Sequence, residues 1–299
     1  GKSYRAKDQE LIHFNKPWAR LDTTLNNGSI RTVKLASEKV FTIDDKDYKR
    51  LSLDKTLPVV LFEPNHLQLL SGGPERRRDY LDELIEQTTV GYSTIRRQYL
   101  RALSQRNNLL KQNYTDRNHI FPWDVKLSQF AGQIIRARLR LVNIINERLN
   151  SLYDELSGGK ASASLQYLNK WPVDNYETSL LKALEANIEL DSLKGFTSLG
   201  PHREDFVIKL NKHPTQLTAS RGETRTLILT LKIIELSIIE ETRNIKPLLL
   251  LDDVFSELDQ NRRQHLINYL QNHQVFITTT DADLNTSKFA GQTKTIKLK

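Results

Sequence analysis

The sequence predicts an α/β fold, in which a parallel sheet is covered by helices, and three observations predict it. Residues 248–251 are four consecutive leucines, a pattern typical of a strand buried on both faces of such a sheet. Residues 57–62 and 275–279 are further short apolar runs of strand length. Long segments with apolar residues at helical spacing separate these runs.

An antiparallel meander is expected near the start of the chain. Residues 19–49 hold three short runs in which apolar and polar side chains alternate. Asn27 and Gly28 separate the first two runs, and Asn-Gly is the strongest short signal for a hairpin turn. We therefore expect these strands to pair with their neighbours in the order of the sequence.

Helical spacing extends over most of the remaining chain. Leu81 and Ile85, for example, lie four residues apart and would share one helix face. A loop with Pro122 is expected to separate the first two helices, and Gly158 and Gly159 begin a further connection. The expected helices span residues 75–112, 123–156, 177–189, 220–240 and 260–272.

Two carboxylates follow the leucine run. Asp252 and Asp253 come where the strand ends, and open α/β sheets bind ligands at the carboxyl ends of their strands. Two charges beside an apolar strand are costly unless a cation or hydrogen-bond donors lie nearby. The pattern therefore predicts a ligand site at this edge. The alternative is a buried strand that leads into a helix capped by aspartate.

A helix start lies upstream of this strand. Ser220 and Glu223 form a capping box, so Ser220 should begin the helix. Gly222 leaves the first turn without a side chain, which lets another group approach the backbone closely. Free N–H groups, a hydroxyl and an open glycine suit a phosphate. The alternative is a helix that simply begins here.

The capped helix and the leucine strand with its two aspartates together resemble the signature helix and Walker B strand of ABC-type ATPases. The finer resemblance is to the RecF family of ABC/SMC-like ATPases, and its motifs run in family order over nearly the whole chain. The Gly-Pro-His-Arg block at residues 200–203 is particularly typical of this family. The matching blocks are residues 62–64, 76–78, 200–206, 219–226, 250–259 and 276–281.

The resemblance implies a domain organisation. The expected architecture is an ABC-type P-loop NTPase lobe, with a mixed sheet, flanking helices and the antiparallel meander, into which an all-helical lid domain is inserted. The lobe would comprise residues 1–75 and 195–299, and the basic helical lid would comprise residues 76–194.

The resemblance also implies roles for individual residues. Asp252 would hold Mg²⁺, and Asp253 would be the general base that takes the proton of the attacking water. Ser220 and Gly222 would contact, in trans, the nucleotide bound by the other subunit. The remaining implied positions are Glu63 in the Q-loop region, Ser256 and Asp259 in the D-loop, and Thr279 and Thr280 in the switch. For Glu63 the alternative is a strand end stopped by proline, and for the D-loop pair it is a helix cap.

Positive charge is concentrated in the expected lid. Residues 76–150 contain 14 Lys and Arg against 7 Asp and Glu, whereas the rest of the chain contains 30 against 29. Such a basic stretch is the footprint expected of a protein that binds a phosphate backbone, although a solvated helix surface is the alternative. Arg136, Arg138 and Arg140 have no acidic residue nearby in the sequence. The expected DNA contacts are Arg76, Arg77, Arg78, Arg136, Arg138 and Arg140.

One motif of the family is missing from the sequence. No G-x-x-x-x-G-K-[ST] pattern, which would cradle the phosphates of a nucleotide, occurs in the 299 residues. Gly1, Lys2 and Ser3 match its last letters, but polar residues follow them instead of an apolar helix. Ser3 and Arg5 fit better to a segment that follows the Walker A helix in the family. The chain as printed is therefore expected to hydrolyse no ATP.

The function that the resemblance implies is recombinational DNA repair and replication. The protein would bind ATP and Mg²⁺, dimerise on ATP, and bind junctions of single- and double-stranded DNA, helping RecO and RecR to load RecA. The lack of cysteines and of membrane-length apolar runs is consistent with a cytoplasmic protein. The resemblance further implies that the protein is associated with the nucleoid. The main alternative is a non-enzymatic DNA-binding module without a working nucleotide site. Another ABC/SMC-like DNA-end ATPase is disfavoured, because no long heptad arm is present.

Overall fold

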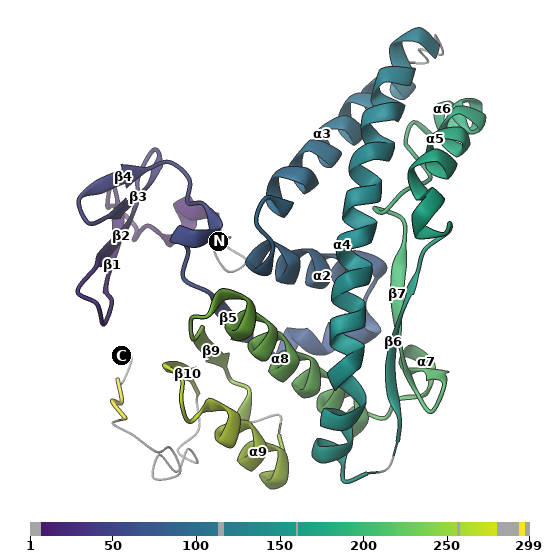
Figure 1. Cartoon of the computed structure of the whole chain (residues 1–299). Coiled ribbons are helices and arrows are strands. Elements are labelled where there is room, and N and C mark those ends of the chain that lie inside the picture. The colour runs from purple at the N-terminus through teal and green to yellow at the C-terminus, as the bar shows by residue number, and fades with distance from the viewer. Residues whose placement is uncertain (1–6, 113–116, 160, 256–257, 280–292, 297–299) are drawn as a thin grey trace. The chain divides into compact units, whose positions relative to one another are not determined.

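The structure is a computed structural model that describes residues 7–112, 117–159, 161–255, 258–279 and 293–296. It divides into two compact units, residues 1–57 and residues 58–299, and Figure 1 follows the chain through both by colour. Gly1, Lys2, Ser3 and Arg5, which were compared above with the Walker A motif and the segment after it, lie outside the described residues.

The first unit contains the antiparallel meander that the sequence predicted. Its hairpin turn lies at the Asn-Gly signal, where Gly28 has a φ of +82° and its N–H donates to the carbonyl of Leu25 at 2.9 Å. Short 3-10 turns, η1 (Asp8–Leu11) and η2 (Leu53–Lys55), lie before and after the strands in the sequence. The four strands pair in sequence order and are β1 (Ala19–Thr24), β2 (Ile30–Leu35), β3 (Lys39–Ile43) and β4 (Lys46–Tyr48).

This meander has an apolar face but no buried residue of its own. The register places Leu21 beside Val33 on one face, and Asp22 beside Thr32 on the other. On the polar face the Thr32 hydroxyl donates to the Asp22 carboxylate at 2.6 Å. None of residues 7–57 is buried. The strands are therefore held by their ladder hydrogen bonds and by such polar contacts, without a core inside the unit.

The second unit contains the predicted parallel sheet. Strands β5 (Val59–Phe62), β9 (Leu248–Asp252) and β10 (Val275–Thr278) lie in the order β10-β9-β5, and both pairings are parallel. Leu249 and Leu251 are buried, but Leu248 and Leu250 are only half-buried. The expected burial of the leucine run on both faces is therefore complete on one face only.

Helices of the second unit differ from the predicted ones mainly at their ends. The predicted helix 75–112 is two helices, because the chain turns at Gly91, which has a φ of +84°. Pro122 lies inside a helix and not in a loop; burial of its neighbours Ile120 and Asp124 outweighs the missing helical hydrogen bond. The predicted helix 177–189 also divides in two. The helical segments are η3 (Pro64–Leu67), α1 (Gln68–Ser71), α2 (Pro74–Thr88), α3 (Tyr92–Lys111), α4 (Arg117–Ser157), η4 (Val173–Asn175), α5 (Tyr176–Ala186), α6 (Ile188–Lys194), α7 (Thr215–Thr218), α8 (Arg221–Arg243) and α9 (Gln260–Leu270).

A second sheet is antiparallel, and its first strand begins within the connection expected after Gly158 and Gly159. Strand β6 (Ala163–Leu168) pairs with β7 (Asp205–Leu210), and β7 pairs with the short β8 (His213–Pro214). Side chains of β6 alternate between buried and exposed, which is the period of a half-buried strand. The range 76–194 is therefore not entirely helical.

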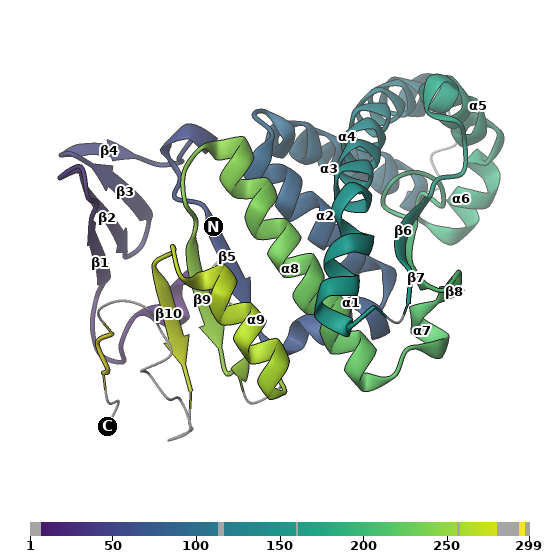
Figure 2. The same cartoon turned by 60° about the horizontal axis from the view of Figure 1, so that its bottom comes forward.

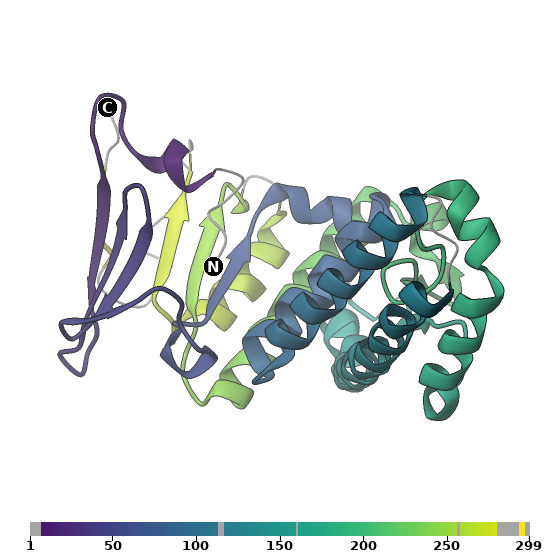
Figure 3. The same ribbon diagram turned by 90° about the horizontal axis from the view of Figure 1, so that it is seen from above.

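Most helices and both sheets of the second unit share one hydrophobic core, while Leu110, Ile120 and Ile188 form a second, small cluster. The long helix α4 packs against α3, α5, α8 and β6. Figures 2 and 3 show α8 and α9 on the same face of the parallel sheet. The boundaries predicted at residues 75/76 and 194/195 stay a prediction. In the described part of the chain, no helix is both long enough and apolar enough to cross a membrane.

A fully buried ion cluster ties three helices together. The guanidinium of Arg106 on α3 donates to Asp124 on α4 at 2.5 Å and to Asp191 on α6 at 2.7 Å. All three side chains are 0% exposed. Arg106 also donates to the hydroxyl of Thr197 at 2.9 Å. Burial raises the pKa of Asp124, although the charge of Arg106 acts against that shift.

We expect the substitution Arg106→Met to lower the free energy of unfolding by about 3–5 kcal/mol, because it leaves two buried carboxylates without their cation. Arg101→Met, on the exposed face of the same helix, is the matched control and should change the free energy by less than about 0.5 kcal/mol. Urea unfolding followed by circular dichroism measures both. Equal stability of the two variants would contradict the role of the cluster.

Candidate functional site

The aspartate that ends strand β9 lies against strand β10. Asp252 pairs in register with Thr278, and the Thr278 hydroxyl donates to the Asp252 carboxylate. The N–H of Asp253 donates to the carbonyl of Thr278 at 3.1 Å. The hydrogen-bond donors that the sequence analysis required beside the carboxylates are therefore supplied partly by β10.

Asp253 adopts a left-handed backbone conformation. Its φ is +48°, a region that aspartate tolerates better than most residues but that still costs energy. This conformation ends the strand directly after Asp252, and the chain then turns towards the buried Phe255. At the carboxyl end of the sheet, Asp252 therefore has an extended backbone and Asp253 has a left-handed backbone.

The capping box of helix α8 is confirmed. Ser220 Oγ accepts from the N–H of Glu223 at 3.2 Å, and the N–H of Ser220 donates to the Glu223 carboxylate at 2.7 Å. These hydrogen bonds lower the pKa of Glu223. A side chain at Gly222 would meet no atom nearer than the guanidinium of Arg262, at 3.8 Å. The first turn of α8 is therefore open to a ligand beside Gly222.

Arg262, which sequence reasoning did not single out, connects this helix start with α9. Its Nε donates to Thr226 on α8 at 2.8 Å, and its guanidinium forms an ion pair with Asp259. Asp259 caps α9 by accepting from the N–H of Arg262 at 2.9 Å. The helix-cap alternative for Asp259 is thus observed, and its D-loop role stays a prediction. Ser256 lies outside the described residues.

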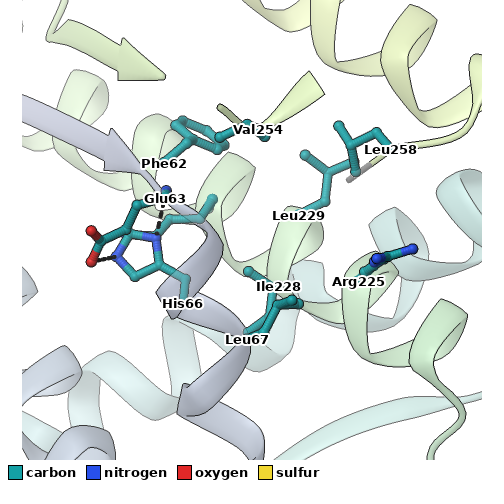
Figure 4. Close-up of a pocket in the computed structure, with 10 residues that line it drawn as sticks. Phe62, Glu63, His66, Leu67, Arg225, Ile228, Leu229, Val254 and Leu258 are labelled. Atoms are coloured by element: carbon teal, nitrogen blue, oxygen red, sulfur yellow. Dashed lines mark hydrogen bonds and ion pairs between the residues drawn. The ribbon is translucent and has the colours of Figure 1, made fainter. Parts of the chain in front are cut away.

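A pocket lies beyond the carboxyl ends of β5 and β9 (Figure 4). Its polar edge carries Glu63 and His66; the N–H of Glu63 donates to His66 Nδ1 at 3.2 Å. Val254 and Leu258 face it from the β9 side. Helix α8 contributes its apolar side and two cations, and these residues are Arg225, Ile228, Leu229 and Lys232. The pocket thus brings the expected Q-loop position together with the segment after Asp253.

The switch residues are placed only in part. Thr279 is described and exposed, whereas Thr280 lies outside the described residues. The threonine that contacts Asp252 is Thr278, which directly precedes these two residues. The roles of Thr279 and Thr280 stay predictions.

Two of the arginines that were expected to contact DNA are buried, and the expectation does not hold for them. Arg138 is 3% exposed and forms two hydrogen bonds to Asp82, each of 2.9 Å. Arg77 is 5% exposed and forms two hydrogen bonds of 2.8 Å to Asp205. Arg138 has no acidic residue nearby in the sequence, but its partner Asp82 comes from another helix. A DNA backbone has no access to these two side chains.

The other four expected arginines remain accessible to different degrees. Arg136 forms an ion pair with Glu177 of α5 at 2.7 Å, so it too has a partner that the sequence did not reveal. Arg78 is half-buried and donates to the carbonyl of Glu204 at 3.0 Å. Arg76 and Arg140 are exposed, and neither has an ion pair with any described residue.

The Gly-Pro-His-Arg block is fixed by several helices. Arg138 donates to the carbonyl of Pro201 at 2.8 Å, and the side chain of Tyr99 leaves only 2.8 Å to a Cβ at Gly200, so no larger residue fits there. The Tyr99 hydroxyl donates to His202 Nδ1 at 2.6 Å, and His202 Nε2 donates to the carbonyl of Thr197 at 3.0 Å. Burial lowers the pKa of His202 to about 4. The imidazole is therefore neutral near pH 7.

The comparisons with known proteins agree on one family. No family model matches the chain. Over 309 aligned residues it is 32% identical to the DNA replication and repair protein RecF of Clostridium perfringens, an alignment that covers 99% of this chain and 84% of that protein. It is 36% identical to RecF of Clostridium beijerinckii, over 95% of this chain and 80% of that protein.

Solved structures give the same result and confirm the predicted fold class. The structure of the recombination mediator protein RecF-ATPrS in the RecFOR pathway has a TM-score of 0.86 and 29% identity, over 97% of this chain and 81% of that chain. For the corresponding RecF-ATP structure the TM-score is 0.83 and the identity 28%, over 94% and 79%. Similarity to RecF proteins therefore extends over nearly all of the sequence, and the chain belongs to the RecF family of DNA replication and repair proteins.

Proposed function

We propose that this protein is a DNA-binding ATPase of recombinational repair and replication, which dimerises when it binds ATP. The observation that carries the proposal is the pairing, within one unit, of a carboxylate at the end of a parallel β9 with a capped, open start of α8. Membership of the RecF family supports it, as does the similarity to RecF-ATP structures.

The proposed nucleotide site uses Asp252 and Asp253. Magnesium is usually held by one or two carboxylates together with waters and substrate phosphates, so the Asp252 carboxylate beside the Thr278 hydroxyl fits that ion. In the described residues no cluster of three His, Cys, Asp or Glu could hold a metal alone, which also fits an ion bound mainly through phosphate. When bound, Mg²⁺ neutralises phosphate charge. Asp253 is proposed as the base that accepts the proton of the attacking water.

The second half of the site is proposed to come from another copy of the chain. Ser220 and Gly222 stand at the start of α8, where free N–H groups and the missing side chain favour a phosphate. Arg262 holds this start next to Asp259, the expected D-loop residue. In this arrangement, the ATP of one copy is contacted by the α8 start of the other, so nucleotide binding and dimerisation are linked.

The proposed DNA surface uses the accessible arginines of the predicted lid. Arg76 and Arg140 have no ion pair with a described residue, so their charges are available to phosphates. Arg136 can contribute only in competition with Glu177. The preferred DNA is a junction of single and double strands, and RecO and RecR are the proposed partners in loading RecA.

The accessible arginines by themselves also fit a second candidate function, a DNA-binding module without ATP hydrolysis. The two functions are distinguished by phosphate release: the protein expressed from its complete reading frame should hydrolyse ATP under the first proposal and should only bind DNA under the second.

In that protein, Asp253→Asn should slow hydrolysis by about 10²-fold or more while ATP still binds, because an amide accepts no proton from water. Asp252→Asn should instead weaken the magnesium-dependent binding of ATP. Phosphate release and equilibrium binding of a fluorescent ATP analogue measure the two effects. Asp252→Asn and Asp253→Asn with the same phenotype would contradict the separate roles.

Arg140→Gln should weaken DNA binding and reduce the slope of log affinity against log salt by about one unit, because one phosphate contact releases roughly one counterion. Arg138→Gln, two residues away on the same helix, should leave that slope unchanged and lower the melting temperature, since it breaks a buried ion pair. Fluorescence anisotropy over a salt series measures the slope. A changed slope for Arg138→Gln, with none for Arg140→Gln, would reverse the assignment.

A further inference from the structure

Arg203 differs from the other polar residues of the segment 197–205. The side chains of Thr197, His202, Glu204 and Asp205 are all bonded to groups on the surrounding helices and strands. The guanidinium of Arg203 is exposed, and in the described chain it has no carboxylate within ion-pair distance. Its charge is therefore not neutralised inside the protein.

An aromatic ring holds the Arg203 side chain in place. The guanidinium carbon lies 4.7 Å from the centre of the Phe196 ring, and Nε makes a long contact of 3.4 Å with the carbonyl of Thr197. Phe196 is itself 39% exposed. A guanidinium packed on a ring keeps its N–H donors free at the edge of its plane, which suits recognition of an oxyanion.

A second unneutralised arginine lies near the same segment. Arg78 of α2 is half-buried, and its donor contact is with the carbonyl of Glu204, the residue after Arg203. None of the described carboxylates forms an ion pair with it. Burial, and to a lesser extent the positive charge of Arg138, lowers the pKa of Arg78, while the charges of Asp205 and Glu75 act against that shift.

His202 lies within the electric field of these cations. The positive charges of Arg203, Arg78 and Arg138 all disfavour its protonation. Arg138 is neutralised by Asp82, but Arg203 and Arg78 have no such carboxylate. Two free guanidiniums beside a neutral imidazole are the arrangement expected where an anion is to be bound.

We propose that Arg203 and Arg78 form a binding site for a phosphate group, with Phe196 as the platform that orients Arg203. The site deepens the proposed function, on which it rests for the expected source of the phosphate, a DNA backbone. A free nucleotide offers the same chemistry, so the test must distinguish the two sources. Arg203 is the residue that supplies two donors in one plane to the phosphate oxygens.

The His202 ring reports directly on this site. A bound phosphate favours the imidazolium, so the ring pKa should rise from about 4 when the anion binds. Protonation of Nδ1 requires only that the Tyr99 hydroxyl turn from donor to acceptor, and the carbonyl of Thr197 continues to accept from Nε2. The ring resonances of His202, followed by NMR over pH 3–7, measure this pKa in the full chain.

The probes are inorganic phosphate, ATP, and a single-stranded and a duplex oligonucleotide. We expect the oligonucleotides to raise the ring pKa by about one unit, and Arg203→Gln to abolish that shift and weaken oligonucleotide binding about 5–10-fold at low salt. Arg203→Lys, which keeps the charge but not the planar fork, should restore part of the affinity. Arg101→Gln is the charge-matched control: two residues from Tyr99 on α3, it lies about 200° around the helix and should leave the oligonucleotide-induced shift of the His202 pKa unchanged.

The outcomes separate the site from the wider function. A response to inorganic phosphate or ATP without one to oligonucleotides supports the phosphate site and identifies a free nucleotide as its source. If the wild-type protein binds no DNA at all, the DNA-binding function fails, and the inorganic phosphate titration still decides the site. No change of the His202 pKa with any probe, together with unaltered binding in Arg203→Gln, would overturn the proposal and leave Arg203 as a residue that packs on Phe196.

Discussion

The arrangement of the second unit depends on the hydrogen bonds that the buried guanidinium of Arg138 donates. From one position on α4 it binds Asp82 of α2, the hydroxyl of Tyr167 on β6 and the carbonyl of Pro201 before β7. A charge removed from water must have partners for its donors, so these three elements cannot separate from α4 without a large cost. The helices of the predicted lid and the β6-β7 sheet are therefore one packed body.

This body fixes where the functional segments begin. The chain leaves the clamped Pro201, forms β7, β8 and the single turn of α7, and arrives at Ser220, which caps α8. Helix α8 packs against α4 and leads back to β9, whose last residue is Asp252. The segments that carry Ser220 and Asp252 are thus connected directly through α8. Arg262 of α9 also contacts α8, through the hydroxyl of Thr226.

Sequence pattern predicted the elements whose signals are local. The Asn-Gly turn, the capping box at Ser220 and the leucine strand with its parallel neighbours are determined by residues close together in the chain, and the structure confirms them. The sequence pattern did not predict contacts between residues that are far apart in the chain. In the sequence Arg138 has no visible acidic partner, because Asp82 lies 56 residues earlier. Strand β6 begins in an expected connection, because its partner β7 is also distant in the sequence. The alternation of apolar and polar side chains over residues 163–167 is a strand signal that was available from the sequence and was missed.

The central claim is that each nucleotide site combines Asp253 of one copy with Ser220 of another. Mixing two inactive variants, Ser220→Arg and Asp253→Asn, tests it most directly in protein from the complete reading frame. A mixed dimer has one site with both residues intact, so we expect ATP hydrolysis to return on mixing. In an equal mixture with random exchange about half of the dimers are mixed, and about a quarter of all sites should therefore work. Absence of any recovery, when each variant is folded and the subunits are shown to exchange, would contradict a site shared between two copies.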